Sequence, residues 1–418
     1  MQEVKSFKIS KNLIWQAWLK VKSNKGGCGV DGVEISEFEK DLKKNLYKLW
    51  NRMSSGSYFP SAVKQVLIPK PDGGDRPLGI PTVADRVAQM AAVLVLNPIL
   101  EPCFHENSYG YRPNKSAHQA IRVARQRCWK FDWVLDVDIK RFFDTIDHGL
   151  LMKAIRRHTT NKWILLYVER WLVVPYECSG KKVLRDKGIP QGSVIGPVLS
   201  NLFMHYSFDK WIEKTHPEIL FERYADDIVC HCNSKVEAEW LKEALLKRLE
   251  SCKLELNEEK TKITYCKDSN RKENHDQIAF DFLGFTFRPR KARNKRGHVF
   301  TSFIPAISNK AKKRIMREVR SWWKTSRTDK SLKELAEWYN PRIQGWVNYY
   351  GKFYKSGLYG IFHSLNRRLA KWITKKFKRY RRHKRRGMYL LGKIARKDPQ
   401  IFAHWQFGVL PSLGGDTK

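Results

Sequence analysis

Three aspartates at the ends of short apolar segments are the side chains of this sequence best suited to chemistry. Asp226 and Asp227 stand in a tight turn between residues 221–224 and 228–232, two apolar runs that are expected to be strands. Adjacent carboxylates in a partly dehydrated turn are costly unless a cation balances their charge. Oxygen ligands of this kind suit Mg²⁺. The plainer interpretation is an Asp-rich turn without a ligand, because Asp is common in turns.

A third aspartate strengthens the metal-binding interpretation. Asp138 ends the short β-rich run of residues 133–138, and its side chain would point into the same kind of cleft as the turn. Two strands that bring three carboxylates to one point form the scaffold of two-metal nucleotidyl transfer. Asp136 and Asp144 are alternative ligands. Asp136 lies one strand repeat deeper, and Asp144 is expected to cap the helix that follows it.

The elements expected around these aspartates are helices and short strands. Residues 1–60 are expected to be helical with a glycine-rich break, and residues 63–68 alternate like a strand before a hairpin turn. A helix is expected from Thr82 to about Leu96, with Pro98 ending it. Further along, the pattern predicts helices over residues 197–214 and 236–252 and strands near residues 262–265 and 280–287. The chain is therefore expected to be α+β with a helical appendage.

The positive charge of the chain is concentrated in its last third. Lys and Arg outnumber Asp and Glu by 80 to 42, which gives a formal net charge of +38. Residues 288–386 carry 31 Lys and Arg against 4 Asp and Glu, a net charge of +27. Because such an excess repels itself, it requires a polyanionic partner, and nucleic acid is the usual one. The aromatic residues of this stretch are expected to be mostly core, and the basic residues are expected to face phosphates.

Composition excludes several other classes of protein. A hydrophobic content of 42% with 12% aromatic residues excludes a disordered chain. The longest apolar stretch, residues 87–100, is interrupted by Gln89 and Asn97 and is shorter than the ~20 residues that a membrane helix needs. No two of the eight cysteines form a Cys-x-x-Cys pair, and the N-terminus is polar and basic. We expect a cytoplasmic protein with reduced thiols and no membrane partner.

Seven sequence blocks follow one another along nearly the whole chain. They include a Tyr-Ala-Asp-Asp signature, and they cover residues 68–82, 108–118, 138–143, 188–202, 224–227, 256–285 and 344–350. In type and order these blocks resemble those of the reverse transcriptases encoded by bacterial group II introns, also called intron maturases. The first block is similar to the fingers hairpin of that family, and the last is similar to its thumb segment.

The resemblance implies a right-hand polymerase fold and an activity. It implies an N-terminal extension over residues 1–60, fingers and palm over residues 61–289, a helical thumb or maturase domain over residues 300–360, and a short basic nucleic-acid-binding region over residues 361–418. The implied function is RNA-directed DNA synthesis, which copies RNA into cDNA, together with binding of intron RNA that assists splicing and mobility. No His-Asn-His nuclease module is visible, so cleavage of the second DNA strand is not expected of this chain.

The resemblance also carries roles onto individual residues. Asp138, Asp226 and Asp227 would be the catalytic carboxylates, and Asp138, Asp226 and the Ile139 carbonyl would bind metal. Phe143 would exclude the ribose 2′-hydroxyl. The residues that would contact the incoming dNTP are Lys70, Arg76, Ile139, Phe143, Gln191 and Lys260. The basic residues that would contact nucleic acid are Lys375, Lys376, Lys378, Arg379, Arg381, Arg382, Lys384, Arg385 and Arg386.

Cofactors and partners follow from the same resemblance. Two Mg²⁺ ions, with Mn²⁺ as a substitute, would serve an enzyme that takes an RNA template, intron RNA, a DNA primer, target DNA and dNTPs, as a monomer or homodimer. Two alternatives stay open: an intron-independent reverse transcriptase in repair or defence, and a maturase that acts mainly by binding RNA. Intact Asp138, Asp226 and Gln191 favour an active polymerase over the second alternative.

Overall fold

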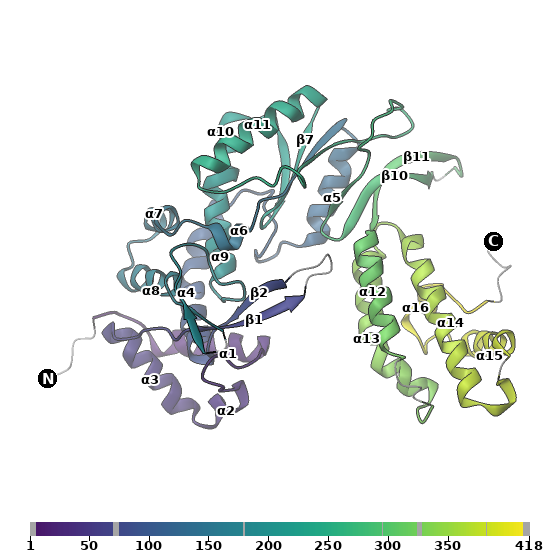
Figure 1. Cartoon of the computed structure of the whole chain (residues 1–418), viewed down its shortest axis with the longest axis horizontal. Coiled ribbons are helices and arrows are strands. Elements are labelled where there is room, and N and C mark those ends of the chain that lie inside the picture. The colour runs from purple at the N-terminus through teal and green to yellow at the C-terminus, as the bar shows by residue number, and fades with distance from the viewer. Residues whose placement is uncertain are drawn as a thin grey trace. The chain divides into compact units, whose positions relative to one another are not determined.

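The computed structural model divides the chain into two compact units (Figure 1). Unit 1 comprises Met1–Arg127 and Phe131–Ile263, and unit 2 comprises Cys128–Lys130 and Thr264–Lys418. The residues that the structure describes are 6–69, 75–178, 180–294, 296–323, 328–381 and 383–412. Helices and sheets occur in both units, which confirms the α+β class. The right-hand architecture in detail and the four domain boundaries remain predictions.

Unit 1 begins with the helices expected from the first 60 residues. Ser10 caps the first of them by accepting a hydrogen bond from the Leu13 N–H at 3.1 Å. The glycine-rich break that follows is held by Arg86, whose Nη2 donates to the Gly27 carbonyl at 2.7 Å. The helices concerned are α1 (Lys11–Asn24), α2 (Ile35–Lys40), α3 (Leu42–Ser55) and α4 (Val83–Leu100), and α4 packs against α1 and α3.

Helix α4 is the apolar core helix of unit 1. Thr82 caps it by accepting from the Asp85 N–H at 3.1 Å, as its sequence predicts. The prediction that Pro98 ends the helix is wrong, because α4 continues to Leu100. A proline so close to the C-terminus removes a single hydrogen bond in the last turn, so the helix tolerates it. Residues 83–103 are long and apolar enough to cross a membrane, but 61% of their most apolar window is buried in the fold, which is also typical of a core helix.

A four-stranded sheet carries the aspartates. Its order is β6-β7-β3-β8, and β7 is antiparallel to both of its neighbours. The strands are β3 (Trp133–Val137), β6 (Leu220–Tyr224), β7 (Asp227–Cys232) and β8 (Lys262–Tyr265). Val134, Leu135, Ile228 and Val229 are fully buried in the core beneath α11 (Lys235–Ser251), which packs on β3 and β7. The predicted strands and their turn are therefore confirmed.

A second sheet of unit 1 contains the predicted hairpin. Its order is β2-β1-β4-β5, with strands β1 (Val63–Pro69), β2 (Asp75–Ile80), β4 (Tyr176–Cys178) and β5 (Lys181–Val183). The pair Pro69 and Asp75 is the last of the antiparallel β1–β2 ladder, so the chain reverses where the sequence predicts. The turn itself, residues 70–74, lies outside the described part of the chain.

Short helices connect the two sheets. They are α5 (Ala117–Cys128), α6 (Phe142–Thr145), α7 (His148–His158), α8 (Lys162–Leu172), α9 (Gly196–Met204) and α10 (Lys210–Thr215), with a 3-10 turn at Glu101–Cys103. The predicted helix over residues 197–214 is present, with one π turn at His205–Asp209. The prediction that Asp144 caps a helix is wrong, because it lies inside α6. Asp147 caps α7 instead, accepting from the Leu150 N–H at 2.8 Å.

Unit 2 begins with a three-stranded sheet. Its strands are β9 (Phe280–Phe282), β10 (Phe285–Arg293) and β11 (Val299–Ile307) in the order β11-β10-β9. The predicted strand structure near residues 280–287 is confirmed, but Leu283 and Gly284, with φ of +50° and +80°, form a turn between β9 and β10 that was not predicted. The apolar run hides this turn because hydrophobic residues occupy both strands of the pair.

The rest of unit 2 is helical. Its helices are α12 (Asn309–Ser321), α13 (Leu332–Tyr350), α14 (Tyr359–Lys376), α15 (Lys384–Lys397) and α16 (Ala403–Gln406), with 3-10 turns at Lys355–Leu358 and Lys378–Tyr380. Trp322 stacks on Tyr339 with a centroid distance of 4.2 Å and on Trp346 at 5.4 Å. Trp322 and Trp372 are buried as predicted for core aromatics, whereas Trp338 is 45% exposed.

Candidate active site

Asp138 follows directly on β3, where the backbone is held from one side. Its N–H donates to Thr261 Oγ1 at 3.3 Å, and its carbonyl accepts from the Asn257 N–H at 2.8 Å. Ile139 forms an antiparallel bridge with Leu256. Since carbonyls alternate along a strand, the Ile139 carbonyl faces the opposite edge from the Asp138 carbonyl. That edge is the one on which β7 pairs with β3, so the Ile139 carbonyl is directed to the side of the Asp226 turn.

Asp226 occupies the turn between β6 and β7, and Asp227 is the first residue of β7. Ala225, just before them, has a left-handed φ of +59°, which makes the reversal tight. Loss of solvent, followed by the charges of Asp226 and Asp138, raises the pKa of Asp227 to about 7. Part of the Asp227 residue is nevertheless exposed to solvent. The three aspartates therefore lie within electrostatic reach of one another, and a bound cation would relieve their repulsion.

One cleft of unit 1 gathers most of the predicted site residues. The hollow measures about 1230 Å³. The predicted residues that line it are Asp138, Ile139, Phe143, Gln191, Asp226 and Lys260. Two carboxylates, a main-chain carbonyl, an aromatic ring, an amide and a cation thus converge on one space. This is the arrangement expected for a site that binds a nucleotide with metal ions.

The cationic hairpin can be followed only in part. Lys70 lies outside the described residues, and the side chain of Arg76 is not described. The Arg76 backbone pairs with Ile68 in the β1–β2 ladder. Its neighbour Pro77 lines the cleft. The hairpin therefore borders the cleft, and the roles of Lys70 and Arg76 stay predictions.

Several cleft residues were missed by the sequence analysis. They are Lys140, Arg141, Thr145, Glu255, Asn257, Glu258 and Glu259. Lys140 and Arg141 directly follow Asp138 and Ile139, so their position next to the first carboxylate was an available signal. Arg141 has a positive φ of +45°, an uncommon conformation for a residue with a side chain. Asn257 lies in the sequence block of residues 256–285, and its N–H donates to the Asp138 carbonyl at 2.8 Å.

The loop that contains Gln191 is fixed to both neighbouring elements. Gln191 Nε2 donates to Asp144 Oδ1 at 3.3 Å, and the Gln191 carbonyl accepts from the Gly79 N–H of β2 at 2.6 Å. Gly192 has a φ of +108°, and a Cβ at this position would lie 2.5 Å from the Gly79 carbonyl oxygen. Only glycine fits there without displacing the hairpin. The glycine that follows Gln191 is therefore required by the backbone conformation of the loop and by its close approach to β2.

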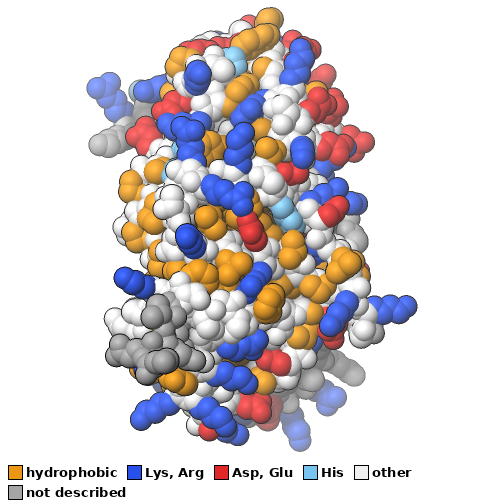
Figure 2. Space-filling view, turned by 90° about the vertical axis from the view of Figure 1, so that its left-hand side faces the viewer, with side chains coloured by type: hydrophobic (Ala, Val, Ile, Leu, Met, Phe, Trp, Pro, Cys, Tyr) orange, Lys and Arg blue, Asp and Glu red, His pale blue; other side chains and the backbone are white. Residues whose placement is uncertain are grey.

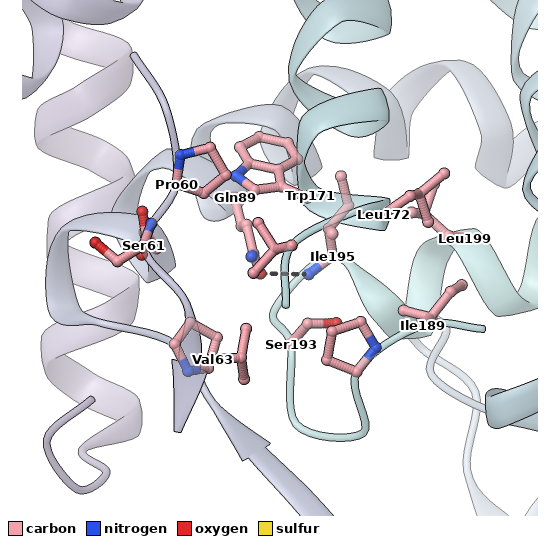
Figure 3. A pocket seen from close by; sticks show the side chains of 14 residues that line it. Pro60, Ser61, Val63, Gln89, Trp171, Leu172, Ile189, Ser193, Ile195 and Leu199 are labelled. Atoms are coloured by element: carbon pink, nitrogen blue, oxygen red, sulfur yellow. Dashed lines mark hydrogen bonds between the residues drawn. The ribbon is translucent and has the colours of Figure 1, made fainter. Parts of the chain in front are cut away.

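Helix α4 holds the following residues of this loop through a buried amide. Gln89 Oε1 accepts from the Val194 N–H at 2.8 Å and from the Ile195 N–H at 3.4 Å. Figure 3 shows Gln89 pointing into a small pocket between Trp171 and Ser193, with the bond to Ile195 drawn as a dashed line. In the sequence Gln89 was only an interruption of an apolar stretch. The structure shows that the amide oxygen of Gln89 accepts hydrogen bonds from two backbone N–H groups of the loop that carries Gln191.

Phe143 lies half-buried in the cleft wall. It belongs to α6, and its ring meets Phe142 edge to face at a centroid distance of 5.3 Å. The Phe143 carbonyl accepts from the Ile189 N–H at 2.7 Å, which ties α6 to the loop before Gln191. The backbone of Phe143 is therefore held by the loop, and its ring packs against Phe142.

The predicted basic cluster belongs to unit 2. Lys375, Lys378, Arg379, Arg381, Lys384, Arg385 and Arg386 are exposed, and Arg382 lies outside the described residues. Lys376 differs from the others, because it is half-buried and its Nζ donates to the carbonyls of Thr328 and Lys330 at 2.9 and 2.6 Å. Figure 2 views another region of the chain, the side on which α3, α7 and α8 lie in Figure 1, and there Lys and Arg are scattered among hydrophobic and acidic side chains.

The donor set of the cleft fits a divalent cation that keeps open positions. In the described ranges, no group of three or more His, Cys, Asp or Glu side chains is arranged as a complete metal site. Asp138, Asp226 and the Ile139 carbonyl supply oxygen atoms only, which suits Mg²⁺, and Mg²⁺ commonly completes its shell with water and substrate phosphates. Loss of solvent and, after it, the charges of Asp226 and Asp138 raise the pKa of Asp227 beside this donor set.

Comparison with known families matches both units. Residues 68–287 match the family described as reverse transcriptase (RNA-dependent DNA polymerase). Residues 312–390 match the group II intron, maturase-specific domain. The first match spans the hairpin, the loop with Gln191 and all three aspartates, and the second spans helices α13 and α14.

Individual relatives agree with these matches. Protein YkfC of Escherichia coli is 32% identical over 303 residues, which cover 63% of this chain and 77% of that protein. The group II intron-encoded protein LtrA of Lactococcus lactis is 25% identical over 81% of this chain and 69% of its own length. The putative COX1/OXI3 intron 1 protein of Saccharomyces cerevisiae is 28% identical over 61% of this chain and 37% of its own length. The chain therefore belongs to the reverse transcriptase family, as a reverse transcriptase with the maturase-specific domain of group II intron-encoded proteins.

Proposed function

We propose that the cleft of unit 1 joins dNTPs to a DNA primer on an RNA template by two-metal nucleotidyl transfer. The observation that carries this proposal is the presence of Asp138 and Asp226 on the wall of one cleft, together with Gln191, Phe143 and Lys260. Reverse transcriptase domains generally use divalent metal ions such as Mg²⁺. In this reaction the primer 3′-oxygen bonds to the α-phosphorus, the bond to the β-phosphate oxygen breaks, and pyrophosphate leaves.

Asp138, Asp226 and the Ile139 carbonyl would hold the metal ions. Bound there, the ions supply a lower pKa for the primer 3′-hydroxyl and charge stabilisation for the leaving pyrophosphate. The chain contributes geometry, because Asp138 is fixed by Thr261 and Asn257 on one side and Asp226 by its turn on the other. Such positioning, together with charge stabilisation, accounts for most of the rate enhancement in phosphoryl transfer.

The remaining cleft residues fit an incoming nucleotide. Gln191 would contact the nucleotide from a loop that is held on two sides, and the ring of Phe143 would exclude a 2′-hydroxyl. Lys260 and Arg141 would face the triphosphate, whose negative charge needs cations from several directions. Lys70 and Arg76 would add to these cations from the hairpin. Selection of deoxynucleotides would then depend on Phe143.

Primer extension tests the proposed chemistry. Wild-type protein is given an RNA template, a DNA primer, dNTPs and MgCl₂, beside a variant that combines Asp226→Ala and Asp227→Ala. We expect synthesis by the wild type alone, with both proteins folded as judged by circular dichroism. Synthesis by the double variant would place the chemistry elsewhere, and no synthesis by folded wild type would reject the proposal.

We infer a second role, binding of intron RNA that assists splicing. It is supported by the maturase-specific match over residues 312–390 and by the net charge of +27 over residues 288–386. Polyanion binding of this kind neutralises phosphates and does not require the cleft carboxylates. Splicing of the RNA that surrounds the gene, with and without the protein, tests the role. No intron around the gene would favour the alternative of a repair or defence enzyme.

A further inference from the structure

A buried arginine lies next to the turn that carries Asp226. Arg223 of β6 has a fully buried side chain, and its guanidinium makes a bidentate ion pair with Asp209, with Nε and Nη2 each 2.6 Å from a carboxylate oxygen. Asp209 is fully buried as well. Two side chains of opposite charge are thus enclosed together, which is tolerated only when the geometry satisfies both.

The third nitrogen of the guanidinium reaches the turn itself. Arg223 Nη1 donates to the Ala225 carbonyl at 3.0 Å and lies 3.1 Å from Asn201 Oδ1. The Ala225 carbonyl belongs to the peptide bond that leads into Asp226. Since Ala225 has a left-handed φ of +59°, this peptide adopts an orientation that an L-residue disfavours by about 1 kcal/mol or more. The hydrogen bond from Arg223 fixes that orientation.

Further contacts join Asn201 and Arg223 to the backbone of Tyr109 and Gly110, which lies against the turn. Asn201 Nδ2 donates to the Gly110 carbonyl at 2.6 Å, and the Tyr109 N–H donates to the Arg223 carbonyl at 2.7 Å. Gly110 lies so close to the turn that a Cβ there would be 2.4 Å from the Ala225 nitrogen. The turn therefore rests on a backbone surface to which Asn201 and Arg223 are both bonded.

Asp209 owes its position to the π turn. It ends the turn at His205–Asp209, between α9 and α10, where one helical residue is inserted. Such insertions redirect the side chains that follow them. His205 Nδ1 lies 3.9 Å from Asp209, but burial lowers the pKa of His205 to about 4, so the imidazole is neutral at pH 7. Arg223 is thus the cation that balances Asp209.

We propose that Arg223 is a positioning residue for catalysis, anchored by Asp209 and Asn201, that sets the direction in which Asp226 presents its carboxylate to Asp138. The proposal rests on the proposed function, in which Asp138 and Asp226 hold the metal ions. Arg223 itself does not line the cleft. It acts through the Ala225 carbonyl, so its loss shifts Asp226 without removing a ligand.

A purely structural role is the competing explanation, and the same strand offers a matched control. Glu222, the residue before Arg223, has a fully buried side chain and pairs with Arg127 at 2.6 Å. Arg127 also donates to the Phe221 carbonyl at 2.7 Å. Arg127, whose side chain is 15% exposed, supports β6 but makes none of the turn contacts that Arg223 makes. Losing it measures the cost of breaking an ion pair in this sheet.

The experiment compares Arg223→Gln and Arg223→Lys with the control Arg127→Gln. The measurements are thermal unfolding, kcat for primer extension, the MgCl₂ concentration that gives half-maximal rate, and Mn²⁺ binding by electron paramagnetic resonance without substrate. We expect both Gln variants to unfold at lower temperature. Only Arg223→Gln is expected to lower kcat, by about 100-fold, and to weaken metal binding about tenfold, because small displacements of catalytic groups are costly. Arg223→Lys, which keeps the charge, is expected to recover part of kcat.

A variant with Arg223→Gln and Asp209→Asn keeps the test valid if the single variant does not fold. It removes both charges and keeps the shapes, so it is expected to fold while kcat and Mn²⁺ affinity stay low. Normal kcat and Mn²⁺ affinity in folded Arg223 variants would overturn the inference, as would equal losses in Arg127→Gln. Wild-type protein that binds Mn²⁺ no better than Asp226→Ala would instead reject the metal site of the proposed function.

Discussion

The two units place their charges in opposite ways. Unit 1 contains 41 Lys and Arg against 32 Asp and Glu, whereas unit 2 contains 39 against 10. In unit 1, ion pairs join Arg223 to Asp209, both fully buried, and the 15% exposed Arg127 to the buried Glu222, and both Arg223 and Glu222 lie on β6. In the described part of unit 2, the core around Trp322 consists of stacked aromatic rings, and the ion pairs of α13 are at the surface.

This difference fits the roles that we propose for the two units. A catalytic carboxylate must be directed to within a fraction of an ångström, and buried charge pairs hold a backbone turn at that accuracy. A surface that binds a polyanion needs many cations facing solvent, and acidic partners there would cancel its charge. Aromatic packing supplies the core around Trp322 in unit 2, and because 39 Lys and Arg meet only 10 Asp and Glu, most of the positive charge is not balanced within the unit.

Removing the carboxylate of Asp226 should have the largest effect of the changes considered. It should reduce the activity proposed for unit 1 and leave the RNA binding proposed for unit 2 almost unchanged. With Asp226→Asn we expect primer extension to fall by at least about 10³-fold, because a metal ligand is replaced by a neutral amide. Binding of RNA to unit 2 should change little, since that affinity comes from phosphate contacts. Single-turnover extension and filter binding of the same RNA measure the two quantities. Equal losses in both would show that the cleft and the RNA surface are one site.

The sequence predicts the turn that carries Asp226 and Asp227 well because its signal is local. Asp226 and Asp227 stand between two apolar runs, and each run can form a strand without help from distant residues. Asp138 is equally clear, since a short β-rich run precedes it. The hairpin of β1 and β2 follows from turn chemistry in the same way.

The contacts that hold the turn could not be predicted. Asp209 and Asn201 reach Arg223 through a π turn and a helix, so only the tertiary fold brings them together. Gln89 looks like a defect in an apolar helix until the loop at Val194 is present to use its oxygen. Pro98 was misjudged because a proline in the last turn of a helix removes only one hydrogen bond, and the turn at Leu283 and Gly284 was missed because apolar residues occupy both strands around it.

Neutralising the basic cluster of unit 2 should have the next largest effect. We choose the exposed residues Lys375, Lys378, Arg379 and Arg381 and replace each with Gln. If each contacts one phosphate, the dependence of log K on log salt should become shallower by about 0.7 to 0.9 per residue. The affinity for RNA at moderate salt should fall by about 10- to 100-fold. Binding titrations between 50 and 300 mM KCl provide the slope.

Unit 1 supplies the control for this charge effect. Lys235 and Lys247 are exposed on α11, which packs on the catalytic sheet. Replacing both with Gln should change the affinity for RNA and the salt slope much less per residue than the cluster does. A slope that responds equally to both sets of residues would mean that the net charge of the protein, and not a surface of unit 2, determines binding.

A buried histidine in each unit predicts how acid affects stability. Burial lowers the pKa of His404 in unit 2 to about 3 and that of His205 in unit 1 to about 4. In the unfolded chain a histidine has a pKa of about 6.5. Below that pH the unfolded chain binds a proton at each histidine, whereas the native state does not. Each histidine therefore contributes stability above about pH 6.5 that is lost at about 1.4 kcal/mol per pH unit as the pH falls toward the native value.

Single variants show which unit responds. His404 donates from Nε2 to Asn366 Oδ1, 2.7 Å away, and in the described structure its Nδ1 has no partner, so the neutral form is well accommodated. His404→Gln should lower the free energy of unfolding at pH 8 but flatten its decline between pH 6 and 4.5, as measured by urea unfolding. His205→Gln should do the same for unit 1. An unchanged decline in both variants would mean that other groups control acid unfolding.

The smallest expected effect tests whether charge is the only difference between the units. Ser331 caps α13 in unit 2 by accepting from the Glu334 N–H at 3.2 Å, and Ser234 caps α11 in unit 1 by accepting from the Glu237 N–H at 3.1 Å. Replacing either serine with Ala should cost about 1 kcal/mol of unfolding free energy, because a cap satisfies a local backbone donor wherever the helix lies. Urea unfolding of Ser331→Ala and Ser234→Ala measures both costs. Similar losses of unfolding free energy in the two variants would mean that the units differ in their charges and not in their local helix contacts. A several-fold larger loss in unit 2 would show that its helices depend on local contacts, whereas unit 1 relies on its ion pairs.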